Sequence, residues 1–278
     1  QAPATPPESA SQAEATAPVT IQFAFTAGDQ PILCGQEITG LGTADNTAVV
    51  NDGRFYVSNV RLLNTAGDAV PVALDQDGVW QFEGTALLDF ENGEAGCSES
   101  GNPELNETVR GSVPAGEYSG IAFELGVPFA LNHQDVTVAA SPLNIPAMWW
   151  NWQAGYKFVR IDLKTNAEAT DGAWFIHLGS TGCDSPDNAT PPTATCARPN
   201  IATIQLAALD PANSVVVADL SSLLANVNLS ESTPQPPGCM SGPDDPDCMT
   251  LLPAFGLDIA TGACTDPTCS QQQFFRVK

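Results

Sequence analysis

Short runs of alternating apolar and polar residues, separated by clusters of Gly, Pro, Asn and Asp, constrain the fold more than any other feature. In the first run, apolar residues fall at every second position, the period of a half-buried strand, namely Val19, Ile21, Phe23 and Phe25. Similar runs occur at 54–63, 68–74, 79–84, 119–124, 155–163, 173–178, 200–207 and 214–219. This pattern predicts an all-β, antiparallel β-sandwich with at most short helices. One such helix is expected at 220–226, where Asp219 or Ser221 is a candidate N-cap.

Cysteine usage predicts disulfide-stapled loops. An even number of cysteines in an acidic, loop-rich chain indicates four disulfides and an oxidising compartment. A zinc site is the alternative, but no Cys-x-x-Cys pair occurs and the chain has only 2 histidines. Proximity suggests that Cys183 pairs with Cys196 and that the last four cysteines, in loops at about 231–270, pair among themselves. The eight residues are Cys34, Cys97, Cys183, Cys196, Cys239, Cys248, Cys264 and Cys269.

The N-terminus and the charge restrict location and partners. Residues 1–18 hold almost nothing that a core would bury, which predicts a flexible tether before a single domain over 19–278. The chain starts at Gln1 without a basic or apolar leader, so we expect a periplasmic, cell-surface or secreted protein whose signal peptide has been removed. The net charge of −23 excludes nucleic acid as a partner. No apolar run approaches the ~20 residues of a membrane span, so direct membrane insertion is not expected.

The chain contains only two histidines, His133 and His177. Each can be an ordinary imidazole, exposed after a turn in the first case and hydrogen-bonded within an apolar strand in the second. The alternative is a two-nitrogen metal site across adjacent strands. Two imidazoles suit copper, and thioether or aromatic neighbours favour Cu(I) over zinc. No Ser-His-Asp order, phosphate loop or zinc-protease motif occurs, so no catalytic residue is expected.

Aromatic residues are densest at 147–158, where three of the 5 tryptophans fall within four positions. One interpretation is that these rings fill the end of the sandwich. A second is a platform that stacks on glycans, as in carbohydrate-binding modules. A third is redox chemistry, in which a tryptophan beside a metal is oxidised. The residues alone leave all three interpretations open.

Four motifs together resemble one family. The segment 148–158 (MWWNWQAGYKF) is similar to the tryptophan-rich motif of the MbnP-like copper proteins, the methanobactin-associated four-Cys members of a "metallo-mystery pair". Matching pieces also occur at 55–62 (FYVSNVRL), at 126–133 (GVPFALNH) and at 177–183 (HLGSTGC). The resemblance covers about residues 18–220 in the right order. It favours the metal-site interpretation of the two histidines.

The resemblance also implies a partner and a modification. Members of that family are paired with a diheme enzyme of the bacterial cytochrome c peroxidase type (MbnH-type), which implies oxidation of a tryptophan to kynurenine. In the related copper proteins MopE and CorA the modified tryptophan lies two residues before a histidine, whereas here Leu131 precedes His133. The kynurenine is therefore expected at one of the other tryptophans, with Trp150 or Trp152 preferred over Trp149 and Trp174.

These expectations combine into one site. We expect His133 and His177 to bind one copper ion, as Cu(I), with Met148 as a weak third ligand and Asp135 as the group that fixes the second nitrogen of His133. The protein would then be no enzyme but the substrate of its diheme partner, with a role in copper acquisition or homeostasis. The alternative functions are a surface β-sandwich that binds glycans or adhesive partners through the tryptophans, and a purely structural disulfide module.

Overall fold

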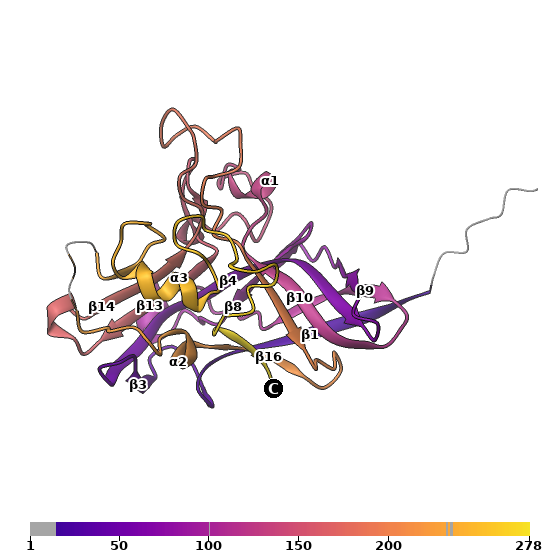
Figure 1. Cartoon of the computed structure of the whole chain (residues 1–278), viewed down its shortest axis with the longest axis horizontal. Helices are drawn as coiled ribbons and strands as arrows, with labels where there is room; N and C mark the ends of the chain where they lie inside the picture. The colour runs from indigo at the N-terminus through magenta and orange to yellow at the C-terminus, as the bar shows by residue number, and fades with distance from the viewer. Residues whose placement is uncertain (1–14, 100, 232, 234–235) are drawn as a thin grey trace, which may run out of the picture.

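Two sheets form the sandwich in the computed structural model, which describes residues 15–99, 101–231, 233 and 236–278 (Figure 1). The smaller sheet has the order β18 (Phe275–Val277), β16 (Val215–Asp219), β1 (Thr16–Ala27), β9 (Thr108–Pro114) and β6 (Ala73–Leu74), with β2 (Gln30–Pro31) beside β1. The larger sheet has the order β15 (Ala202–Ala207), β10 (Tyr118–Leu125), β4 (Asn46–Asn64), β13 (Val159–Thr165), β14 (Ala173–Leu178) and β17 (Gly238–Cys239).

Further short strands extend the larger sheet at its long central strand. β3 (Glu37–Leu41), β5 (Ala69–Pro71) and β8 (Thr85–Asp89) pair with β4, and β7 (Gln81–Phe82) pairs with β8. A separate hairpin of β11 (Trp149–Asn151) and β12 (Gly155–Tyr156) carries most of the tryptophan-rich segment.

Phenylalanine rings join the two sheets in the core. The ring centroids of Phe23 of β1 and Phe123 of β10 lie 5.8 Å apart, and those of Phe123 and Phe275 of β18 lie 5.1 Å apart. Both pairs pack edge to face. Such edge contacts are the favoured geometry for aromatic pairs. Because these residues are buried and come from opposite sheets, they fix the sheets against each other.

The predicted β-sandwich is confirmed, with details that the sequence did not give. In the described part of the chain, β1 pairs in parallel with β16, and β14 pairs in parallel with β17. β1 already begins at Thr16, where Ala17 and Pro18 pair with β9, so the predicted tether ends earlier than residue 18. The rest of the tether prediction, residues 1–14, lies outside the described residues. Strand β8 was missed because all five of its residues are buried and no alternation remains.

Helices are short, as expected. They are α1 (Phe129–Asn132), α2 (Leu220–Leu223) and α3 (Cys248–Ala254), with 3₁₀ turns at Ala95–Glu99, Pro146–Met148 and Glu168–Thr170. Asp219 caps α2 by accepting hydrogen bonds from the amides of Ser221 and Ser222. α3 lies in the C-terminal region that was predicted to be loop. Within the described chain, no helix has the length and apolar character needed to cross a bilayer.

Four disulfides staple the loops: Cys34–Cys97, Cys183–Cys196, Cys239–Cys248 and Cys264–Cys269. As proximity suggested, Cys183 pairs with Cys196 and the last four cysteines pair among themselves. The Cys239–Cys248 bond joins β17 to the start of α3, so the C-terminal loops are tied to the edge of the larger sheet.

Candidate metal centre

His177 lies on β14, and a carboxylate holds one of its two ring nitrogens. The side chain is buried, and its Nε2 lies 2.6 Å from Oδ1 of Asp162 on the neighbouring strand β13. Its Nδ1 is buried and has no hydrogen-bond partner among the described residues. A carboxylate that holds one nitrogen leaves the lone pair of the other nitrogen directed elsewhere, which is the usual arrangement of a metal-binding histidine.

Behind Asp162 lies a buried network of alternating charges. Arg160 donates to Oδ2 of Asp162 at 2.7 Å and lies 3.2 Å from Asp52, which also pairs with Arg54. Burial opposes ionisation of Asp162, but the hydrogen bonds from His177 and Arg160 and the charge of Arg160 hold its pKa below the usual range. Arg160 also donates to the carbonyl of Ala147, so the network reaches the start of the tryptophan-rich segment.

His133 follows α1 and is held in a similar way. Its Nδ1 lies 3.1 Å from the carbonyl oxygen of Trp152, so that nitrogen carries the proton and donates it. Its Nε2 accepts from the side-chain amide Nδ2 of Asn132 at 3.2 Å and lies 3.7 Å from Sγ of Cys196. Burial lowers the pKa of His133, although the bond to Trp152 opposes this shift. The ring is therefore neutral near pH 7, which is the form that ligates metals.

The tryptophan-rich hairpin contacts both histidines. The ring of Trp150 lies 6.4 Å from the ring of His177, while the main chain of Trp152 holds His133. Asn132, next to His133, accepts from the amide of Tyr156 at 2.8 Å and lies 3.4 Å from the hydroxyl of Ser180. These bonds join α1, the hairpin and the end of β14, so the hairpin links the element that carries His133 to the strand that carries His177.

The other tryptophans have different surroundings. Trp149 and Trp152 pack edge to face, with ring centroids 5.9 Å apart and planes at 86°. Two perpendicular rings offer no common plane on which a sugar could stack. Trp174 on β14 is fully buried, and its Nε1 has no hydrogen-bond partner among the described residues.

Met148 and Asp135 lie elsewhere than the sequence suggested. Met148 is fully buried in the hydrophobic core, at the end of a 3₁₀ turn. Asp135 accepts hydrogen bonds from the amide and hydroxyl of Thr137 in an exposed turn. The nitrogen of His133 assigned to Asp135 is held instead by the carbonyl of Trp152. Asp135 is therefore a turn residue in this structure.

Sequence reasoning missed Asp162, the residue that holds His177. The alternation of β13 gave no signal for it, because Asp162 lies between the core residues Ile161 and Leu163 and shares the opposite face of the strand with Arg160. A buried carboxylate needs a partner. Asp52 of β4 and Asp162 of β13 also lie opposite each other. This pairing depends on the register of the two strands, which the sequence does not give.

The arrangement fits a metal ion with few ligands. Each imidazole has one nitrogen fixed, by Asp162 in one case and by a carbonyl in the other. Of the remaining nitrogens, His177 Nδ1 has no hydrogen-bond partner among the described residues, and His133 Nε2 accepts from the side chain of Asn132. Neutral imidazole nitrogens suit copper and zinc. Among the described residues, His133, Cys183 and Cys196 form a group with metal-binding spacing, but the two cysteines are joined in a disulfide and are no thiolate ligands in this state.

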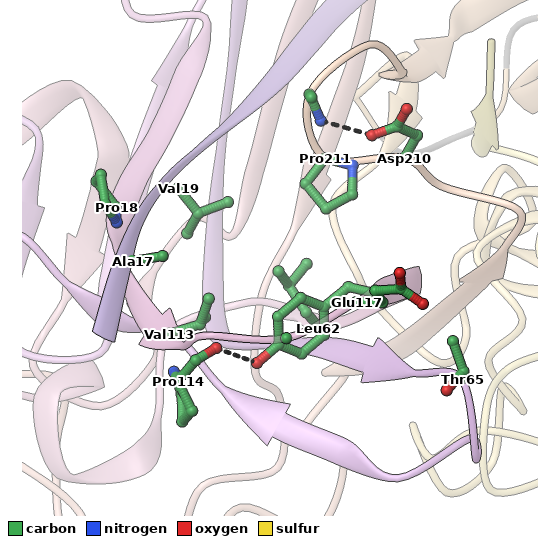
Figure 2. A pocket seen from close by; sticks show the side chains of 13 residues that line it. Ala17, Pro18, Val19, Leu62, Thr65, Val113, Pro114, Glu117, Asp210 and Pro211 are labelled. Carbon is green, nitrogen blue, oxygen red and sulfur yellow. Dashed lines mark hydrogen bonds between the residues drawn. The ribbon is translucent and has the colours of Figure 1, made fainter. Parts of the chain in front are cut away.

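A separate depression of about 580 Å³ lies at the N-terminal strand and contains none of the predicted site residues. Figure 2 shows Val19, Leu62 and Val113 in its wall, where Tyr118 donates to the carbonyl of Pro114 at 2.7 Å. Its lining is mainly apolar, and it offers neither a histidine nor a cysteine to a metal ion.

Comparison with known proteins identifies the family. The MbnP family model matches residues 16–241. A solved structure, MbnP from Methylosinus trichosporium, aligns with a TM-score of 0.84 at 34% sequence identity, covering 95% of this chain and 98% of the other. Curated proteins gave no match. A match over most of the chain at this identity extends well beyond a shared fold, and we conclude that the chain belongs to the MbnP family.

Proposed function

We propose that this protein binds one copper ion as Cu(I) through His133 and His177, in the periplasm or at the cell surface, for copper acquisition or homeostasis. The observation that carries the proposal is the buried Nδ1 of His177, which has no partner in the described chain while Nε2 is held by Asp162. A buried imidazole nitrogen without a hydrogen bond is costly unless something binds it. We assign the second nitrogen to His133, because Trp152 of the hairpin holds its Nδ1 while the Trp150 ring of the same hairpin lies 6.4 Å from the His177 ring.

We further propose that Trp150 is oxidised to kynurenine by a diheme enzyme of the bacterial cytochrome c peroxidase type. Its proximity to His177 distinguishes it from Trp149 and Trp152, which pack on each other. In kynurenine formation, oxygen atoms from the peroxide substrate of the partner enzyme cleave the C2–C3 bond of the indole, C2 leaves as formate, and an aniline nitrogen and a ketone oxygen remain. Either atom adds a polar group next to His177. In this account the protein is the substrate of the partner enzyme and not itself an enzyme.

Mass spectrometry after co-expression with the diheme partner tests the modification. Conversion of tryptophan to kynurenine adds about 4 Da, which peptide fragmentation assigns to one residue. We expect the added mass at Trp150 and its loss in Trp150→Phe. Trp152→Phe is the matched control and should keep the modification. An added mass at Trp152 in the wild type would refute the assignment to Trp150.

A further inference from the structure

The Cys183–Cys196 disulfide faces the imidazole of His133. Sγ of Cys196 lies 3.7 Å from Nε2 of His133. One ring nitrogen and the two sulfur atoms lie within 4.8 Å of one another, and all three residues are buried. Of the four disulfides, this is the one whose sulfurs adjoin a histidine.

We propose that reduction of this disulfide converts the group into a second type of metal site, with two thiolates and one imidazole, for a zinc-class divalent ion. A dithiol reductant supplies two electrons and two protons: the S–S bond breaks, two S–H bonds form, and the reductant becomes a disulfide. When the metal binds, both thiol protons pass to solvent and two metal–sulfur bonds form. Two sulfurs and one nitrogen leave the fourth position of a tetrahedral ion for water.

The surroundings of Cys183 give a reductant a route to the bond. A depression of about 300 Å³ is lined by Gln153, Ala154 and residues 180–183, so it ends at Cys183. Cys196 lies at the other end of a loop whose residues 184–195 are mostly exposed. The loop carries no helix or strand between the two cysteines, so it can adjust when the bond opens.

The state of the imidazole also suits this site. Nδ1 of His133 donates to the carbonyl of Trp152, so Nε2 carries the lone pair, 3.7 Å from Sγ of Cys196. That lone pair accepts from the side-chain amide of Asn132 at 3.2 Å, so the amide must turn away when the metal binds. Fixing the proton on the distal nitrogen is how proteins orient metal-binding histidines. The site shares His133 with the proposed copper site but requires neither His177 nor a modified tryptophan. It therefore stands or falls separately from the proposed function.

Cobalt binding after mild reduction tests the proposal. The unmodified full chain is reduced, freed of reductant without oxygen, and titrated with Co²⁺ alone, whose thiolate charge-transfer absorption reports sulfur ligation. We expect one Co²⁺ per reduced chain and none with this absorption in the oxidised chain. His133→Asn and the double variant Cys183→Ser/Cys196→Ser should lose the stoichiometric binding. Zn²⁺ should displace the cobalt and remove the absorption.

Two controls separate this site from other thiols and from the copper site. Cys264→Ser/Cys269→Ser removes a different short-range disulfide and should keep the cobalt absorption. His177→Ala should keep it too, whatever that variant does to copper. If the serine variant does not fold, as judged by circular dichroism, His133→Asn decides, because it retains all eight cysteines. Equal cobalt binding by reduced wild type and His133→Asn would overturn the proposal.

Discussion

Replacing Asp162 with asparagine tests how the fold prepares His177 for a metal. Oδ2 of Asp162 accepts two hydrogen bonds from Arg160, at 3.0 and 2.7 Å. In Asp162→Asn, the amide oxygen must remain with Arg160, because a guanidinium only donates. The amide NH₂ then faces Nε2 of His177 and donates to it. This moves the ring proton to Nδ1, the nitrogen that is otherwise available to copper.

The size of the effect follows from the 2.6 Å bond between Asp162 and His177. A hydrogen bond to a charged group contributes about 1.5–3 kcal/mol. Tenfold in affinity corresponds to about 1.4 kcal/mol, so loss of this bond weakens copper binding by roughly 10-fold to 100-fold. The same range is typical when the group that holds a metal-binding histidine is removed, about 10-fold to 100-fold.

Competition with a chromophoric Cu(I) chelator measures this change in affinity. Asp135→Asn is the matched control, because it makes the same substitution at a carboxylate that, among the described residues, accepts hydrogen bonds from Thr137 alone. Its affinity should equal that of the wild type. Thermal unfolding of both variants verifies that they remain folded. If Asp162→Asn and Asp135→Asn bind Cu(I) equally well, the proposed role of Asp162 is wrong.

Three further predictions concern other parts of the structure. Burial raises the pKa of Asp89 to about 8, so the folded protein favours the protonated carboxyl. This group therefore contributes its whole stabilisation below the pKa that Asp89 has in the unfolded chain, and the stabilisation is lost as the pH rises toward 8. Asp89→Asn should remove the matching fall in unfolding free energy, on the order of a few kcal/mol between roughly pH 4 and pH 8. Urea titrations at several pH values measure this, and a pH profile equal to that of the wild type would contradict it. A Cβ at Gly179 would lie 2.4 Å from the Trp150 ring and 2.7 Å from the Tyr156 carbonyl oxygen. Gly179→Ala should therefore displace the indole and lower the yield of kynurenine measured by mass spectrometry. A yield equal to that of the wild type would show that the ring position is unimportant. Asp219→Ala should cost about 1 kcal/mol or more of unfolding free energy, since it removes the cap of α2; denaturant titration checks this, and no loss would mean that the cap adds nothing.

The sandwich was predictable because most strands keep one face in the core. Apolar and polar residues alternate around Phe23 and Phe25, and this run lies within β1. Strands buried on both faces, such as β8, escape this signal. The parallel contact of β1 with β16 joins residues almost two hundred positions apart, and no local pattern encodes it. Helix α2 was predictable because its cap, Asp219, is a local signal.

The candidate site was predictable only in its residue types. Histidines are scarce enough that His133 and His177 stood out, and the tryptophan-rich segment between them is conspicuous. The groups that orient the imidazoles were not predictable. Asp162 reaches His177 through the register of β13 and β14, and a main-chain carbonyl holds His133. A carbonyl has no signature in the sequence, so Asp135 was chosen wrongly on proximity alone.

Copper content per folded chain tests the central claim most directly. Native mass spectrometry of Cu(I)-loaded protein should show one copper on the wild type and none on His177→Ala or His133→Ala, with all four disulfides intact and the sandwich folded. A folded His177→Ala variant that still carries one copper per chain would contradict the assignment of the site to this histidine pair.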